Sequence, residues 1–200
     1  AGRKTVRPYL FRIPLPWGGT VTVASYGAMM MVGFLVCLYL LKRRGRGLRL
    51  PAPKLFDIAI AALVGGVVGA RIYYVIYAWD YFAARPLQVV RIDKGGLVFY
   101  GGVIGGTAGV LLFTYLKKLP LRRTADLFGS LLPLGHAFGR VGCFLNGCCY
   151  GKITQAWIGV RFPEQSAAYK DMVRRGMMEA SRATTPALHP TQLYAAAYNL

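Results

Sequence analysis

A run of 21 uncharged residues near the start, residues 21–41, constrains the fold of this chain more than any other feature. A helix needs about 20 predominantly apolar residues to cross a hydrocarbon core about 30 Å thick. The run is too long for the apolar core of a signal peptide, and no cleavage-like sequence follows it. It therefore predicts a first membrane span.

Further apolar runs repeat this pattern along the chain. They cover residues 58–77, 97–116, 127–145 and 191–200. Pro133 lies inside one of them, and we expect a kink there, which neighbouring helices in a membrane can accommodate. Pro190 precedes the last run, in a position that suits the first turn of a helix. Because that run is too short to cross a bilayer, we expect the chain to stop inside a fifth span.

The composition is that of a polytopic membrane protein. Hydrophobic residues make up 55% of the 200 residues and charged residues only 16%, whereas soluble proteins carry about 25% charged residues. These values exclude a soluble domain, and they exclude disorder because the chain has ample apolar surface to bury. A net charge of +18 would suggest nucleic-acid binding in a soluble protein. Here the cations lie between the apolar runs, so we expect membrane lipids as partners and no nucleic acid.

The same cations predict the orientation of the chain in the membrane. The loops at residues 42–54, which include Arg49, and at residues 117–123 are rich in Lys and Arg. Short loops of this kind lie on the cytoplasmic side. The N-terminus, the loop at residues 78–96 and residues 146–188 then face the opposite side.

We therefore predict an all-α polytopic membrane protein, a helix bundle with about five spans in this chain and a small α+β cap. The predicted parts are an outer N-terminal segment, a four-span bundle, the cap and the start of a fifth span, at residues 1–20, 21–145, 146–188 and 189–200. In the cap, residues 157–163 predict a short strand ended by proline. Residues 165–182 predict an amphipathic helix, either in the membrane interface or packed as a lid.

Glycines recur at helical spacing in two of the spans. They are Gly65 and Gly69 in one, and Gly101, Gly102, Gly105, Gly106 and Gly109 in the other. Small residues four apart let two helices approach closely in a membrane, so we expect these glycines to pack helices together. The pairs Gly95–Gly96 and Gly101–Gly102 allow a second interpretation, in which backbone N–H groups at a helix end bind a headgroup phosphate.

Two arginines, Arg71 and Arg140, lie inside predicted spans. An arginine there costs several kcal/mol on most scales, so it normally has a fixed partner or faces an aqueous cavity. One interpretation is a structural ion pair with an acid near a span end, of which the chain has Asp57, Asp80, Asp93 and Asp126. The other is an anionic ligand, because a guanidinium binds phosphate at two points.

The four cysteines, Cys37, Cys143, Cys148 and Cys149, do not have the spacing of a structural zinc site. Nothing in the sequence places His136 or His189 as a further ligand. We therefore expect no metal. A disulfide on the outer side and plain packing both remain open for these cysteines.

Five short blocks, in order along the chain, resemble one known family. The most specific is GRVGCFLNGCCYG at residues 139–151. The others are SYG at 25–27, GAR at 69–71, GGLVFYGG at 95–102 and HPTQLY at 189–194. Together they resemble the prolipoprotein diacylglyceryl transferases, enzymes of the bacterial inner membrane, and the resemblance extends over about residues 10–200.

The resemblance implies a reaction and a membrane topology. The diacylglyceryl group of phosphatidylglycerol would pass to the lipobox cysteine of a preprolipoprotein signal peptide, releasing glycerol phosphate and forming a thioether. This is the first step of bacterial lipoprotein maturation, and it implies no cofactor and no metal. The full-length family has seven spans, and the N-terminus and residues 146–188 would be periplasmic.

The resemblance also implies roles for individual residues. Arg140 matches an essential arginine and would stabilise the leaving phosphate, which needs a cation in a dry pocket. Tyr26 resembles a tyrosine important for activity, and Tyr100 stands where some members carry a histidine proposed as the base, although tyrosine is a poor base at neutral pH. The residues expected to bind phosphatidylglycerol are Arg140, Asn146, Arg71, Gly142, Gly151, Gly101, Gly102, His189 and Gln192.

The sequence departs from the family pattern at three positions. Cys143 stands where members often have Asn, Cys148 where many have Glu, and Ala195 where Glu is usual. A further functionally important arginine of the family, near its C-terminal end, has no counterpart in these 200 residues. The missing acids at 148 and 195 leave a non-catalytic lipid-binding scaffold open. A transporter or channel for an anionic solute also stays open, because arginines inside spans and glycine-packed helices would suit it equally well.

Overall fold

The computed structural model describes residues 6–14, 16, 20–48, 50–91 and 95–200, so Arg49 and Asp93 lie outside the described residues. The chain divides into two compact units. The first unit consists of Ala1–Cys37 and Ser130–Leu200, and the second of Leu38–Gly129.

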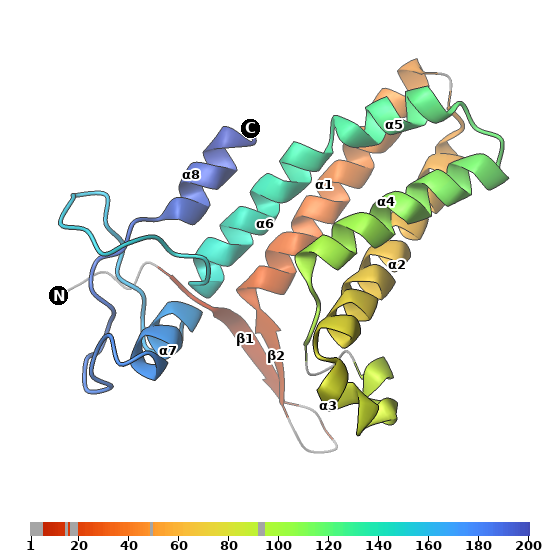
Figure 1. Ribbon diagram of the computed structural model, residues 1–200. Helices are drawn as coiled ribbons and strands as arrows, with labels where there is room; N and C mark the ends of the chain where they lie inside the picture. Colours follow the sequence, from red (N-terminus) through yellow and green to blue (C-terminus); the bar gives the residue numbers. More distant parts are fainter. Residues whose placement is uncertain (1–5, 15, 17–19, 49, 92–94) are drawn as a thin grey trace. The chain divides into compact units, whose positions relative to one another are not determined.

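The structure is mainly helical (Figure 1). Its elements are β1 (Tyr9–Pro14), β2 (Thr20–Ala24), α1 (Ser25–Gly47), α2 (Ala52–Tyr77), α3 (Trp79–Ala83), the 3-10 helix η1 (Pro86–Val90), α4 (Phe99–Leu116), α5 (Leu121–Gly129), α6 (Leu132–Asn146), α7 (Ala167–Arg174) and α8 (Thr191–Tyr198). Among the described residues, α1, α2 and α4 are long and apolar enough to cross a membrane. The prediction of a helical membrane protein is confirmed.

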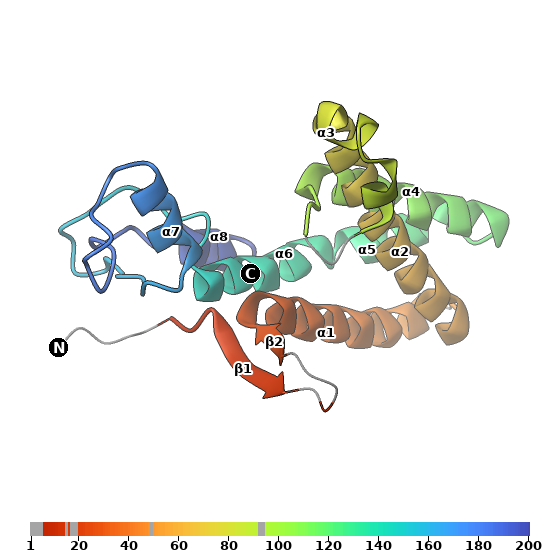
Figure 2. The ribbon, with the colours of Figure 1, turned by 90° about the horizontal axis from the view of Figure 1, so that it is seen from below.

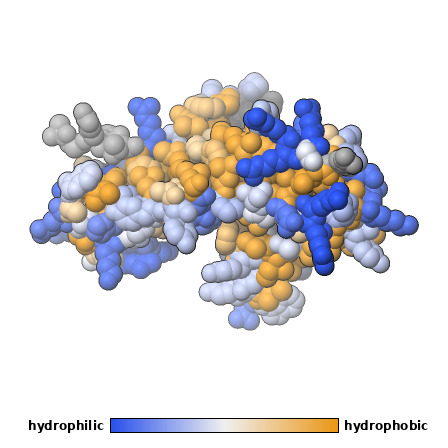
Figure 3. Space-filling model, turned by 90° about the horizontal axis from the view of Figure 1, so that it is seen from above, coloured by the Kyte–Doolittle hydropathy of each residue, from blue (hydrophilic) through white to orange (hydrophobic). Residues whose placement is uncertain are grey.

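Apolar side chains cover much of the visible molecular surface (Figure 3). In α2, for example, Val64, Ile72 and Ile76 are 55%, 54% and 68% exposed. Soluble monomers rarely expose apolar patches of more than a few hundred Å². The exposed apolar faces of these helices are therefore suited to contact with lipid.

The first span begins later than the sequence predicted. Residues 20–24 form β2, which pairs with β1 as an antiparallel hairpin directly before α1 (Figure 2). Alternating Thr and Val favours an extended strand over a helix, because β-branched side chains pack well on a pleated surface. The prediction that the span starts at Val21 is therefore wrong, and α1 starts at Ser25. The Ser25 hydroxyl donates a hydrogen bond to the Arg7 carbonyl.

The predicted fourth span is divided into two shorter helices. Helix α5 ends at Gly129 and α6 begins at Leu132, with Pro133 in its first turn. Proline lacks an N–H group and is accommodated in the first turn, where that group has no partner within the helix. Pro133 therefore lies in the first turn of a new helix, and the expected kink inside one continuous span is wrong.

Glycines let α2 and α4 pack closely against each other in the second unit. A Cβ atom added at Gly65 would lie 2.5 Å from the Gly105 carbonyl oxygen, and one added at Gly109 would lie 2.5 Å from the Ala61 oxygen. Gly69 and Gly101 are in similarly close contact. These separations leave no room for a side chain, which confirms the predicted packing role of these glycines.

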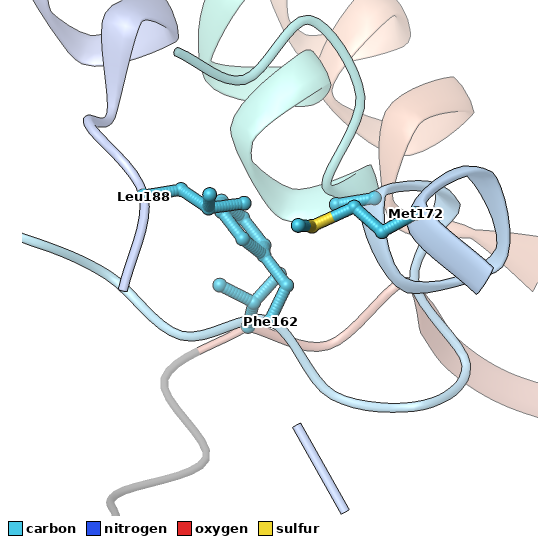
Figure 4. Packing of buried hydrophobic residues seen from close by; sticks show 5 residues of the cluster. Phe162, Met172 and Leu188 are labelled. Atoms are coloured by element: carbon cyan, nitrogen blue, oxygen red, sulfur yellow. The ribbon is translucent and has the colours of Figure 1, made fainter. Parts of the chain in front are cut away.

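The part of the first unit after α6 has a small apolar core (Figure 4). Phe162, Met172 and Leu188 are fully buried there together with Val6 and Ala168. The predicted strand at residues 157–163 is wrong, because this segment forms only isolated bridges, such as Val160 with Leu188. The predicted helix at 165–182 shortens to α7, which is capped by the Ser166 hydroxyl and followed by Gly176 at φ +68°.

Candidate functional site at the end of helix α6

A sharp turn ends α6 and directs the chain back onto the helix. Gly147 has φ +73°, a left-handed conformation that glycine adopts without steric cost. The Gly147 amide donates to the Phe144 carbonyl at 3.1 Å, and the Cys148 amide donates to the Cys143 carbonyl at 3.0 Å. This pair of hydrogen bonds is a Schellman motif. Cys149 follows with φ +56°, so two of three successive residues are left-handed.

The start of α8 holds this turn in place. The Thr191 hydroxyl donates to the Cys149 carbonyl at 2.8 Å, and the Gln192 side-chain amide donates to the Cys148 carbonyl at 2.6 Å. Gln192 is fully buried, and its side-chain oxygen has no partner among the described residues. Nδ1 of His189 lies 3.0 Å from the Tyr194 hydroxyl. His189 and Gln192, which we expected to bind substrate, thus also make structural contacts.

Two glycines of the predicted site allow close packing in the first unit. A Cβ atom at Gly142 would lie 3.1 Å from Cδ2 of Tyr26, so α6 and the start of α1 are in close contact there. A Cβ atom at Gly151 would lie 2.7 Å from Cγ2 of Thr191. The structure thereby brings together the first turn of α1, the end of α6 and the start of α8 with the two residues before it. These segments carry Tyr26, Arg140, Asn146, His189 and Gln192.

Arg140 lies on α6, half-buried, six residues before the helix ends. Its Nε is buried and has no hydrogen-bond partner within the described residues. The ion pairs among those residues join Asp171 to Arg174 and to Arg175, and none involves Arg140. A buried cationic donor without a partner is costly. The described side chains therefore leave this part of the guanidinium free to bind an anion.

Three thiols gather beside Arg140. The sulfur atoms of Cys143, Cys148 and Cys149 all lie within 4.8 Å of one another, and all three cysteines are free. A hydrogen bond with the Cys143 thiol, and a further one from the Asn146 side chain, lower the pKa of Cys148. This cluster was not expected, because sequence spacing does not show that a left-handed turn folds residues 148 and 149 back onto the helix.

A cavity of about 430 Å³ opens beside the turn. Cys148 and Cys149 line it on one side, and Lys170, Asp171 and Arg174 of α7 line it on the other. These three residues of α7 were not predicted as site residues. Their spacing places them on neighbouring positions of one short helix, but it does not show that this face of the helix meets the cysteine turn.

A polar network fixes α7 beside this cavity. The Tyr150 hydroxyl donates to a carboxylate oxygen of Asp171 at 2.8 Å, and Arg174 approaches the other carboxylate oxygen at 2.7 Å. These contacts, that with Tyr150 first, lower the pKa of Asp171. Burial, followed by the hydrogen bond to Asp171, raises the pKa of Tyr150.

Arg71 belongs to the second unit, on α2, and is only 9% exposed. Its guanidinium donates to four backbone carbonyls, those of Gln88 at 2.6 Å, Val89 at 2.7 Å, Gly95 at 3.1 Å and Gly96 at 3.2 Å. The described partners of Arg71 are therefore backbone carbonyls, and neither Asp57 nor Asp80 pairs with it. Asp93, the other nearby acid, lies outside the described residues.

The side chain of Arg71 is also enclosed by aromatic rings. Its guanidinium carbon lies 5.1 Å from the centre of the Phe82 ring and 5.6 Å from that of Tyr74. Gly95 and Gly96 have φ values of +81° and +77° and present their carbonyls to Arg71. The glycine pair thus accepts hydrogen bonds from a cation, where we had considered donation to a phosphate.

The remaining predicted residues of the second unit lie at the start of α4. Tyr100 is 69% exposed, and its ring stacks edge to face on Phe99. Gly101 is buried against α2, whereas a Cβ atom at Gly102 would make ordinary contact, 3.6 Å from the Gly66 carbonyl oxygen. The described contacts of Gly101 are those of a packing residue.

Comparison with known proteins gives a consistent result. The family model described as prolipoprotein diacylglyceryl transferase matches residues 12–200. The phosphatidylglycerol–prolipoprotein diacylglyceryl transferase of Clostridium tetani is 31% identical over 194 residues, 97% of this chain and 70% of that protein. A second enzyme of that name from Clostridium perfringens is 36% identical over 73% of this chain and 57% of its own length. The enzyme from Chlorobaculum tepidum is 35% identical over 88% and 60%. This chain spans 57% to 70% of these relatives.

Proposed function

Because the chain belongs to the prolipoprotein diacylglyceryl transferase family, we propose that its whole protein transfers the diacylglyceryl group of phosphatidylglycerol to the lipobox cysteine of a preprolipoprotein. In this reaction the bond between a glycerol carbon and a phosphate oxygen breaks, and a bond from that carbon to the cysteine sulfur forms. The thiol proton passes to a base, and glycerol phosphate leaves as an anion. The product is a thioether.

The observation that supports this proposal is the free, buried Nε of Arg140. Negative charge grows on the departing phosphate oxygen as the carbon–oxygen bond breaks. A donor that is already oriented and shielded from water stabilises such charge more than bulk solvent does. A guanidinium can also hold two phosphate oxygens at once. Arg140 would therefore bind the phosphate and stabilise it as it leaves.

Other residues near the end of α6 would orient the two substrates. Tyr26, in contact with Gly142, would direct its hydroxyl to the ester or phosphate region of the lipid. Asn146 ends α6 beside the cysteine turn and would hydrogen-bond the glycerol headgroup. Thr191 and Gln192 would act by holding that turn in place. Arg71 would not bind substrate directly but would hold the backbone of residues 88–89 and 95–96 in place through the carbonyls to which it donates. A base role for Tyr100 rests on the family resemblance.

The test is the rate of diacylglyceryl transfer to a lipobox peptide, measured with the full-length protein in lipid nanodiscs. Arg140→Ala should slow transfer by at least about 100-fold, which corresponds to about 3 kcal/mol. Arg140→Lys should restore little of the rate, because lysine lacks the planar two-point contact. Arg182→Ala removes an exposed arginine of the same unit and serves as the matched control.

The same experiment can reject the proposed role of Arg140. If Arg140 only supports the fold, Arg140→Ala will transfer at a near-normal rate and unfold at a lower temperature than the wild type. Rescue of the rate by lysine would also contradict a two-point contact with phosphate. Normal unfolding together with a large loss of rate supports the proposal.

This chain is a bacterial membrane protein, and we propose that it lies in the inner membrane with residues 146–188 in the periplasm. The basic residues of loops 42–54 and 117–123 support this orientation. A cysteine introduced at Arg46, after replacement of the native cysteines, should resist labelling from outside intact spheroplasts. Efficient labelling from outside would reverse the orientation.

A further inference from the structure

The three thiols at the end of α6 form a compact group that the proposed transfer reaction does not use. Their sulfur atoms lie within 4.8 Å of one another although Cys143 is five residues from Cys148. The Schellman turn at Gly147 and the left-handed conformation of Cys149 produce this arrangement. A left-handed residue other than glycine is uncommon, and such conformations cluster at functional sites.

The separation of the sulfurs fits a thiophilic metal ion. With metal–sulfur bonds of about 2.3 Å and tetrahedral angles, three thiolates around one ion stand about 3.8 Å apart. Side-chain rotations that shorten the longest separation by at most about 1 Å would therefore complete three ligand positions. A fourth position would stay open for water or another ligand. Thiolate ligands select soft ions such as zinc and copper(I) over calcium or magnesium.

Charge also favours an ion in this group. Three thiolates around a divalent cation leave a net charge of −1, which needs a nearby positive charge. Arg140 supplies that charge, since it lies on α6 one turn before Cys143. This cation offsets the carbonyl dipoles at the end of α6, which disfavour negative charge.

An ion can reach the three thiols from the cavity between the cysteine turn and α7. Cys149 is exposed, and Cys148 and Cys149 both line the cavity of about 430 Å³ beside α7. A disulfide is the main alternative, but it would use only two of the three sulfurs, and all three thiols are free.

We propose that Cys143, Cys148 and Cys149 together bind one soft divalent metal ion, with zinc as the representative ion. The three thiols release their protons to solvent as the three metal–sulfur bonds form, and no oxidant or reductant takes part. The bound ion fixes the turn at residues 147–149 against α6. The proposal does not rest on the transfer reaction, although Arg140 would serve both sites, and metal binding is therefore measured separately from the transfer rate.

The experiment uses the full-length protein, purified in reducing buffer and exchanged into lipid nanodiscs. Zinc is added, the excess is removed, and zinc per chain is measured by elemental analysis. Cobalt(II) is used in parallel, because thiolate ligands give it an intense charge-transfer absorption. We expect one ion per chain and this absorption in the wild type. Cys148→Ser should weaken binding by at least about 100-fold, whereas the control Cys37→Ser, at a cysteine outside the group, should bind normally.

Three results would overturn the proposal. The first is a wild type that retains no zinc, which does not depend on any variant folding correctly. The second is unchanged zinc affinity in Cys148→Ser. The third concerns protein purified without reductant. If a count of its thiols finds two fewer than the sequence contains, and reduction restores both, the cysteines form a disulfide. An unchanged circular dichroism spectrum of Cys148→Ser shows that loss of binding reflects the missing ligand.

Discussion

Replacing Arg71 with alanine should destabilise the second unit strongly, because this one side chain holds the backbone of η1 and of the segment that precedes α4. The guanidinium donates to four carbonyls that are distant along the chain from α2. A hydrogen bond to a charged group contributes about 1.5–3 kcal/mol, so four bonds at the lower figure give about 6 kcal/mol. Gly95 is exposed, and its carbonyl can bind water after the substitution. We therefore expect a loss of about 3–5 kcal/mol in the free energy of unfolding.

Arg71→Lys should recover only part of this loss. Lysine keeps the positive charge but concentrates its donors at one point, so it cannot reach all four carbonyls. We expect Arg71→Lys to remain about 2 kcal/mol less stable than the wild type. Arg85→Ala is the matched control in the same unit. Arg85 is exposed and lies 4.9 Å above the Tyr81 ring, a contact that contributes about 0.5–1 kcal/mol.

The assay is chemical unfolding of the purified full-length protein in lipid nanodiscs, together with the transfer rate at a temperature where all variants are folded. A change of less than about 0.5 kcal/mol for Arg71→Ala would refute this reasoning. Normal stability with a large loss of transfer would instead show that Arg71 binds the anionic substrate. Equal stability of Arg71→Lys and the wild type would mean that charge alone matters, and that the four hydrogen bonds do not.

Two further predictions concern helix packing and acid stability. Gly105→Ala should destabilise the second unit by about 1–3 kcal/mol, because its methyl group would meet the backbone of Gly65 and Gly69, whereas thermal unfolding of the neighbouring Gly102→Ala should be nearly unchanged. Equal losses in these two variants would contradict the packing argument. Asp171 has a lowered pKa, so its contacts stabilise the fold above the ordinary carboxyl pKa, and this stability should disappear as the pH falls below about 4. Asp171→Asn should flatten that part of a stability–pH profile, and an unchanged profile would show that the carboxylate contributes nothing.

Hydrophobic length and glycine spacing predicted the membrane character of this chain and the helices α1, α2 and α4. Both signals are local, because the cost of exposing backbone polar groups to lipid requires a long apolar helix whatever its neighbours are. The glycine pattern also predicted correctly that these residues pack helices together, and the structure shows that α2 and α4 are the partners. The regular spacing of the glycines is enough for that inference, because residues four positions apart lie on the same face of a helix.

Hydrophobicity and proline position did not predict the correct structure where the same residues suit two different local structures. Residues 20–24 have enough hydrophobicity for a span, but pairing with β1 makes them a strand. Pro133 fits either a kink or a first turn, and the break before Leu132 selects the first turn. The short apolar segment 157–163 suggested a strand, but it finds no continuous partner among the described residues.

The partners of polar side chains could not be predicted from the sequence, because they depend on backbone atoms brought near by folding. Arg71 was expected to meet a carboxylate or a ligand, and it meets four carbonyls instead. Cys143 and Cys148 had no recognisable metal spacing, yet the left-handed turn at Gly147 brings their sulfurs together. Residue type and spacing determine which helices form, whereas the direction of a turn and the contacts of a charge follow from long-range packing, in which many segments are satisfied together.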